Sequence, residues 1–322
     1  MDPTPAFDAD ERRAIDKALT TTRAVRLRLD LTRPVSEDVL LDCIDIAEQA
    51  PCGGAQPSRR WLIVADVDLR ARLGEWYREV LYPGLHAEFN WPVPGHPDFT
   101  GGPMGDSPIE RVFRSALHLG TVFEQVPALV LCTIYGEYDR SGSPGLFDSV
   151  LQAGWSFCLA ARARGVGTCW TTAHLGKAEE IAALLGIPPG VTQVALFPVA
   201  HTLGTEFRAA DRPRAADITF FDQWGLGAGS VTLDVDITDA DPAAVWPQVV
   251  AVCAQRGRVT EAEEPNTCGW TAADHVGRFL LRPRVYGGTR LGCTIRFPDG
   301  TPREHLLVAR AELAQLLRGI TN

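Results

Sequence analysis

Residues 22–64 decide the fold, and they read TRAVRLRLDLTRPVSEDVLLDCIDIAEQAPCGGAQPSRRWLIV. After a basic stretch, Pro34 precedes a helix start, with Ser36 as the N-cap and acidic residues in the first turn. Apolar residues then recur at helical spacing, at Leu40, Cys43, Ile44 and Ala47. The Gly- and Pro-rich residues 50–58 end this helix, and the apolar run at 61–65 is typical of a buried strand. The stretch therefore predicts a helix and a strand joined by a loop of small residues.

The rest of the first two thirds of the chain alternates between helical and strand patterns. Helical patterns occupy residues 7–20, 68–80, 107–124, 146–164 and 177–185. Short apolar runs at 127–135 and 191–200 predict two more strands. Residues 82–108 hold many Pro, Gly and aromatic residues, which is typical of a lid or binding loop. These patterns predict mixed helices and strands without selecting a topology.

A glycine-rich segment after Trp224, Gly-Leu-Gly-Ala-Gly-Ser, is typical of a linker. We place the domain boundary there, with a first domain at 1–226 and a second at 227–322. The second domain has the pattern of a small α+β unit of unknown role. Its predicted elements are a strand at 231–237, a helix at 242–256, a strand at 279–284, a hairpin at 291–307 and a helix at 309–318.

The composition of the 322 residues is that of a globular protein, with 45% apolar and 22% charged residues. A net charge of −9 disfavours nonspecific binding to nucleic acid, which depends on phosphate neutralisation. No apolar run approaches the ~20 residues of a membrane span, and the first residues lack the apolar core of a signal peptide. We therefore expect a cytoplasmic protein that binds neither nucleic acid nor membrane.

The patterns of several common catalytic and metal sites are missing from the sequence. None of the eight cysteines forms a C-x-x-C pair, and the seven histidines show no H-E-x-x-H spacing. We expect most of the thiols to be buried and unpaired, and we expect no metal site. The G-x-S-x-G elbow of α/β-hydrolases is absent as well. No side chain is assigned a catalytic role.

Two basic clusters stand far apart in the sequence. The first holds Arg23, Arg26 and Arg28, and the second holds Arg208, Arg212 and Arg214. A guanidinium group binds phosphate in a fork geometry, so the two clusters could converge on one phosphate. A solvated, charged surface is the alternative that the charge pattern leaves open.

Two glycine loops follow helices rather than strands. They are Cys-Gly-Gly-Ala-Gln at 52–56 and Gly-Val-Gly-Thr-Cys-Trp at 165–170. A dinucleotide-binding Rossmann loop needs a strand, then glycines, then a helix, so this order excludes that interpretation. Each loop is either a helix C-cap or a place where backbone lies close against a flat ligand.

Several motifs in the same order resemble the nitroreductase family over about residues 10–225. Arg-Ala-Val-Arg at 23–26 and the later Arg-Pro-Val are similar to the family's Arg-Ser-x-Arg and Pro-Val. Ala-Pro-Cys-Gly-Gly at 50–54, before a strand, is similar to its Ala-Pro-Ser segment. Residues 161–172 resemble its helix followed by Ala-x-Gly-Leu-Gly-Ser, and residues 179–190 resemble its helix before the last strand. Arg-Pro at 212–213 matches the closing segment of some members.

The resemblance implies an α+β homodimer, with a mixed sheet flanked by helices, that binds FMN at the subunit interface and uses NAD(P)H as electron donor. It implies that Arg23 and Arg26, on either side of Ala24, contact the flavin phosphate or pyrimidine edge, and that Arg212 closes on the phosphate. The residues it implies along the ring system are Pro51, Cys52, Gly53, Gly54, Gly165, Gly167 and Thr168.

Three hypotheses for function follow. The first is an FMN-dependent oxidoreductase that uses NAD(P)H to reduce an electron-poor small organic substrate. The second is a flavin-binding or sequestering protein, or a degenerate scaffold whose C-terminal unit binds a partner. It draws on positions where polar or tightly packed family residues are replaced, at Ala24, Ala55 and Ala200-His201. The third is a flavin-dependent dehydrogenase of a biosynthetic intermediate.

Overall fold

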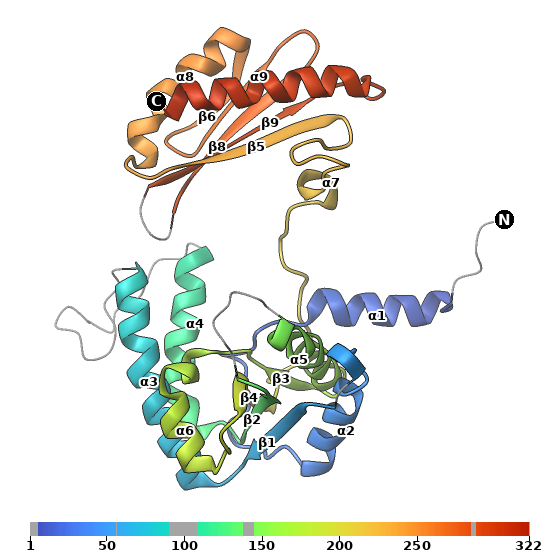
Figure 1. Cartoon of the computed structure of the whole chain (residues 1–322), viewed down its shortest axis with the longest axis vertical. Helices are drawn as coiled ribbons and strands as arrows, with labels where there is room; N and C mark the ends of the chain where they lie inside the picture. Colours follow the sequence, from blue (N-terminus) through green and yellow to red (C-terminus); the bar gives the residue numbers. More distant parts are fainter. Residues whose placement is uncertain (1–5, 56, 90–107, 138–144, 285–287, 322) are drawn as a thin grey trace. The chain divides into compact units, whose positions relative to one another are not determined.

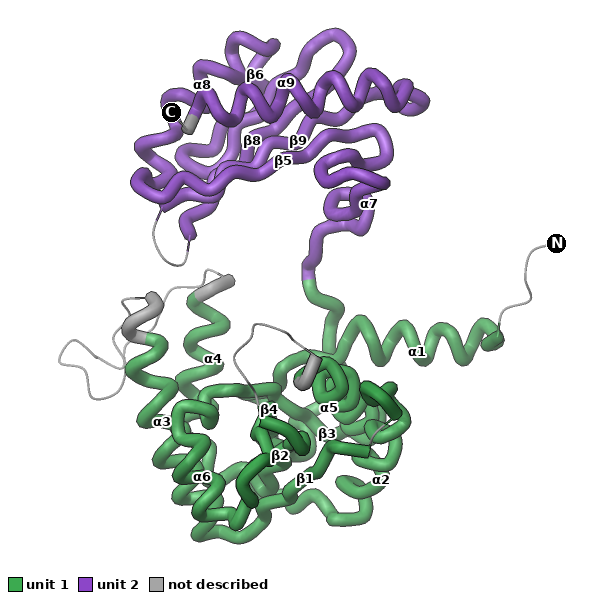
Figure 2. The backbone as a smooth tube through the Cα atoms, viewed as in Figure 1, with its two compact units in different colours: residues 1–210 green, residues 211–322 purple. Residues whose placement is uncertain are grey.

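The computed structural model describes residues 6–55, 57–89, 108–137, 145–284 and 288–321. The chain divides into two compact units, Met1–Ala210 and Asp211–Asn322 (Figure 2). Each unit has its own sheet and its own apolar core. No helix in these residues is long and apolar enough to cross a membrane.

The first unit is built on a four-stranded antiparallel sheet with the order β1-β2-β4-β3. Its strands are β1 (Arg59–Val64), β2 (Ala128–Tyr135), β3 (Val166–Thr168) and β4 (Val191–His201). Its helices are α1 (Ala9–Thr21), α2 (Glu37–Ala47), α3 (Val67–Phe89), α4 (Pro108–Val122), α5 (Gly145–Ala163) and α6 (Ala178–Leu185), and Figure 1 shows their arrangement around the sheet. The α+β class with helices around a sheet is thereby confirmed, although the described strands of this sheet pair antiparallel and do not form the predicted mixed sheet.

Both faces of this sheet are covered. Along β2, successive side chains point to opposite faces, so Val130 and Leu131 belong to different apolar clusters. Val130 packs with residues of α2 and α5, whereas Leu131 packs with residues of α3. Because β2 is buried on both sides, it reads as a continuous apolar run rather than as an alternating one.

The helix predicted after Pro34 is confirmed as α2, which buries Leu40, Cys43 and Ala47. Ser36 is its N-cap, although the Ser36 side chain makes no capping hydrogen bond. The helix predicted at 68–80 is longer than expected, since α3 continues through Pro83 to Phe89. The start of the predicted 82–108 loop is therefore helical, and residues 90–107 lie outside the described part of the chain.

The second unit packs two helices on a five-stranded antiparallel sheet with the order β5-β9-β8-β7-β6. The strands are β5 (Ser230–Ile237), β6 (Arg258–Glu263), β7 (Thr267–Thr271), β8 (Val276–Pro283) and β9 (Thr289–Arg296), and the helices are α8 (Pro242–Arg256) and α9 (Arg303–Thr321). The predicted hairpin at 291–307 is wrong. β9 pairs with β5 and β8, and the turn after it leads into α9.

The division between the two units lies between Ala210 and Asp211, whereas the glycine-rich segment predicts a boundary after residue 226. Residues between the two positions, including the short helix α7 (Ala215–Ile218), bond to the second unit. Arg296 pairs with Asp217, and Arg310 donates to the carbonyl of Trp224 over 2.6 Å. These contacts attach the segment from Asp211 onward to the C-terminal sheet and helices.

Candidate functional site

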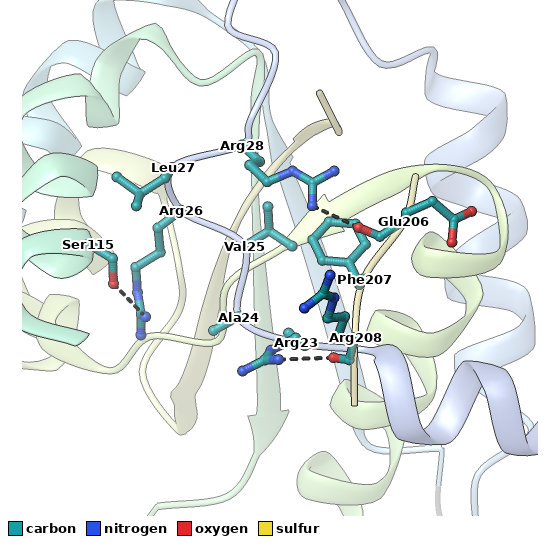
Figure 3. A pocket seen from close by; sticks show the side chains of 10 residues that line it. All are labelled: Arg23, Ala24, Val25, Arg26, Leu27, Arg28, Ser115, Glu206, Phe207 and Arg208. Carbon is teal, nitrogen blue, oxygen red and sulfur yellow. Dashed lines mark hydrogen bonds between the residues drawn. The ribbon is translucent and has the colours of Figure 1, made fainter. Parts of the chain in front are cut away.

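A pocket of about 380 Å³ in the first unit brings together arginines that are far apart in sequence (Figure 3). Its walls come from the segment 23–28, from Ser115 on α4 and from the segment 206–208 that follows β4. The four guanidinium groups around it belong to Arg23, Arg26, Arg28 and Arg208. The remaining lining residues are Ala24, Val25, Leu27, Ser115, Glu206 and Phe207.

Strand β3 fixes the backbone of the first arginine segment. The amide of Val25 donates to the carbonyl of Thr168 over 2.8 Å, and Ala24 forms a parallel bridge with Thr168. A Cβ atom on Gly167 would lie 2.8 Å from Thr202 Cγ2 and 3.0 Å from Val25 Cβ. Only glycine therefore lets the two segments approach this closely.

Two arginines of the pocket are oriented by hydrogen bonds to other elements. Arg26 donates from Nη1 to Ser115 Oγ over 3.2 Å, and Ser115 in turn donates to the carbonyl of Val112. Arg23 donates from Nη1 to the carbonyl of Arg208 over 2.9 Å. Figure 3 shows both bonds as dashed lines. The first basic cluster thus meets one member of the second, as the convergence hypothesis requires.

Arg212 is not among the residues that line this pocket, and its contact with the phosphate stays a prediction. Arg212 belongs to the second unit, and Arg208 of the same basic cluster lines the pocket instead. Gly165 is also not among the lining residues. It ends α5 with a left-handed φ of 71°, and its carbonyl accepts from the amide of Thr202 over 3.0 Å. It thus has the geometry of a helix C-cap.

The loop of Pro51, Cys52, Gly53 and Gly54 is held elsewhere in the unit, and none of its residues lines the arginine pocket. The amide of Gly53 donates to Ser149 Oγ on α5 over 2.9 Å, and Gly54 has a φ of 62°. Within one chain, the 51–54 loop and the arginine pocket are therefore separate, although the sequence predicts that both contact the same ligand.

Buried Arg59 on β1 binds the backbone at the start of the 51–54 loop. Its guanidinium donates to the carbonyls of Ala50 and Pro51 over 3.0 and 3.2 Å, and it pairs with Glu48. The loop is therefore rigidly attached to the sheet. Burial disfavours the Cys52 thiolate, but hydrogen bonds from Ser58 and Ser149 outweigh it and lower the pKa of this thiol.

Sequence reasoning missed Ser115, Glu206 and Phe207. Ser115 is an isolated hydroxyl on an amphipathic helix, and residues 206–208 reach the pocket only through tertiary structure. Arg208 was predictable as a member of the second basic cluster. Among the described residues, no group of His, Cys, Asp or Glu side chains is placed to hold a metal ion.

The arrangement is suited to an anion. Arginine stays protonated throughout the physiological range and offers planar, paired N–H donors to phosphate or carboxylate. In a chain with a net charge of −9, four guanidinium groups around one pocket make a local positive potential. Among the described lining residues, Glu206 is the one carboxylate.

A model of the nitroreductase family matches residues 19–201 of the chain. This range includes the 23–28 segment and β3, but it ends before Arg208 and before the second unit. Solved structures with a similar fold include an oxidized iodotyrosine deiodinase bound to FMN and 3-iodo-L-tyrosine. It is 17% identical with a TM-score of 0.47, and the match covers 66% of this chain and 100% of that one.

Two further structures show the same degree of similarity. A BluB-like flavoprotein from Clostridium difficile 630 is 19% identical with a TM-score of 0.47, over 66% of this chain and 98% of that one. A nitroreductase with bound FMN from Desulfitobacterium hafniense DCB-2 is 18% identical with a TM-score of 0.46, over 65% and 98%.

Proposed function

The chain belongs to the nitroreductase family, and from that premise we propose that it is an FMN-dependent oxidoreductase that uses NAD(P)H to reduce an electron-poor small organic substrate. The observation that carries the proposal is the pocket that Arg23, Arg26, Arg28 and Arg208 surround. The phosphate of FMN is a dianion near neutral pH, and a charge-assisted hydrogen bond to it is worth ~1.5–3 kcal/mol.

The residues beside the pocket also fit a flat ring. Ala24 is small, and it lines the pocket where the 23–28 segment meets β3. Backbone flanked by small residues permits the close approach that a ring system needs. When bound, FMN supplies hydride and electron transfer chemistry. The chain's residues bind the phosphate, orient the cofactor and shape access for the substrate.

We propose that the protein acts as a homodimer. The 51–54 loop and the arginine pocket are apart within one chain, so a second copy would bring its own loop to the pocket of the first. Large apolar side chains on neighbouring helices support this arrangement. Leu41 on α2 is 52% exposed, and Leu151 and Trp155 on α5 are 49% and 43% exposed. Leu151 and Trp155 are four residues apart and share one face of α5, and exposed apolar residues on one helix face are typical of an interface.

The spectrum of the purified protein tests this function. We expect a yellow protein that absorbs near ~450 nm, releases FMN on denaturation and is bleached by NADPH or NADH without oxygen. Arg23→Gln is expected to lower FMN occupancy, whereas Arg12→Gln on α1, outside the pocket lining, is expected to leave it unchanged.

Other outcomes identify the alternatives. A yellow protein that nicotinamides do not bleach would indicate flavin binding or sequestration, consistent with the apolar residues Ala24 and Ala55. Bleaching by a metabolite without nicotinamide would indicate a dehydrogenase. A protein that binds no flavin at all would overturn the proposal.

A further inference from the structure

We propose that Arg28, Arg162 and Phe207 are positioning residues that hold the segment 203–208 so that Arg208 meets the flavin phosphate beside Arg23. This inference rests on the proposed function, because it concerns the same pocket. It assigns different roles to the arginines near the pocket: some bind the anion, and others build the wall that presents it.

The segment 203–208 needs such support because it follows β4 without forming a helix or a strand. Its residues from Leu203 to Glu206 are exposed. Segments of this kind take their conformation from side chains that bind their backbone, since no regular hydrogen-bond ladder does so.

Arg28 supplies most of that support. Its Nε donates to the carbonyl of Leu203 over 2.9 Å, and its Nη1 donates to the carbonyl of Glu206 over 2.8 Å. A Cβ atom on Gly204 would lie 2.8 Å from Arg28 Nη2, and Gly204 has a φ of 77°. Gly204 therefore permits both the turn and the approach of the guanidinium group. With its N–H groups on two carbonyls, Arg28 is a structural clamp.

Arg162, near the end of α5, supports the same segment. Its Nη2 donates to the carbonyl of Thr205 over 2.9 Å. Both guanidinium groups also lie over the ring of Phe207, with Cζ at 4.3 Å from the ring centroid for Arg28 and 4.8 Å for Arg162. Phe207 thus joins the two clamps through cation–π contacts.

Arg208 directly follows Phe207 in the chain. Its carbonyl accepts the hydrogen bond from Arg23, and its side chain lines the pocket (Figure 3). Within the described part of the chain, the Arg208 guanidinium donates no hydrogen bond to protein, so its donors are available to a phosphate. The two guanidinium groups over Phe207 fix this ring, and Phe207 is the residue directly before Arg208. The position of Arg208 in the anion site therefore depends on these contacts.

Binding of FMN and of riboflavin to the apoprotein, followed by flavin fluorescence, tests the inference. We expect Phe207→Leu and Arg162→Gln to weaken FMN binding about tenfold each, because each removes part of the stack. Riboflavin lacks the phosphate, so its affinity is expected to stay unchanged. Phe207→Tyr keeps an aromatic face and is expected to restore FMN affinity. Phe7→Leu, at an exposed phenyl outside the pocket lining, is the control.

Three results of the binding measurements would overturn the positioning role of Phe207 and Arg162. Unchanged FMN affinity in Phe207→Leu and Arg162→Gln, with normal FMN binding by the wild type, would overturn it and leave the proposed function standing. Equal losses of FMN and riboflavin would also overturn it, because they would indicate general damage to the fold. A wild-type protein that binds neither flavin would overturn the proposed function and this inference together.

Discussion

Arg23 donates a hydrogen bond to the backbone carbonyl of Arg208, 2.9 Å away and 185 residues later in the chain. The contact joins the first basic cluster to the second across the fold of the first unit. It also shows why the pocket depends on backbone placement as much as on charge, since Arg208 is held through its main chain and leaves its side chain free for a ligand.

Gly167→Ala is expected to separate β3 from the arginine segment. The new methyl group would lie 3.0 Å from Val25 Cβ, and overpacking of this kind costs ~1–3 kcal/mol. Chemical denaturation of the full chain measures the change in unfolding free energy. Gly84→Ala in α3 is the matched control, because a Cβ there meets no atom within 4 Å and alanine favours helix. Equal stability of both variants would contradict the tight contact.

Stability at acid pH is expected to depend on His174. Burial lowers the pKa of this imidazole to about 4 from 6.5, so the folded state holds it neutral while the unfolded state protonates it. The contribution of His174 to the free energy of unfolding is then fully present above pH 6.5, and it falls by ~1.4 kcal/mol per pH unit down to about pH 4.

Denaturation curves from pH 7.5 to 4 of the wild type and of His174→Phe measure this effect. The variant is expected to lose the part of the slope that this residue causes. A wild type and a variant with parallel pH profiles would show that His174 is not the group responsible.

Cys52 is expected to be the reactive thiol. It is half-buried with a lowered pKa, whereas the other seven cysteines are buried. A thiol–disulfide exchange reagent should therefore modify about one thiol per native chain near neutral pH, and Cys52→Ser should remove that reaction. FMN should slow it if the 51–54 loop faces the cofactor. Rapid reaction of several thiols in the folded protein would refute the assignment.

Trp155→Arg is expected to disrupt the proposed homodimer and to weaken FMN binding with it. An exposed tryptophan at the centre of an interface typically contributes 2 kcal/mol or more, so the dimer dissociation constant should rise by about 30-fold or more. Light scattering over a concentration series measures the mass. Trp224→Arg, at a 69% exposed residue of the second unit, is the control. A monomeric wild type that binds FMN tightly would exclude the shared site.

The sequence predicted the local elements of the first unit better than those of the second. α2 was predictable because its cap and apolar stripe are local signals. β6 was not, since all of its residues are exposed and it is an edge strand whose pairing with β7 is tertiary. The predicted hairpin failed because β9 pairs with β8, the strand directly before it, and with β5, which lies far from it in sequence, while the residues after β9 form α9.

The same distinction applies to the site. Charge clustering pointed to Arg23, Arg26 and the region of Arg208, because like charges close in sequence stand out by themselves. Ser115 enters the pocket through the contact of α4 with Arg26, and Phe207 enters it beside Arg162 of α5. No local pattern encodes either contact. The separation of the 51–54 loop from the arginines is likewise a property of the folded chain.

The phosphorus NMR resonance of FMN mixed with excess protein tests whether the arginine pocket binds the flavin phosphate. Free FMN titrates with the second phosphate pKa, about 6. Guanidinium groups favour the dianion, so we expect a shifted resonance that stays constant from pH 5 to 8 in the wild type and moves toward the free position in Arg23→Gln. A resonance that follows the free-FMN titration curve in the presence of wild-type protein would show that these arginines do not bind the phosphate.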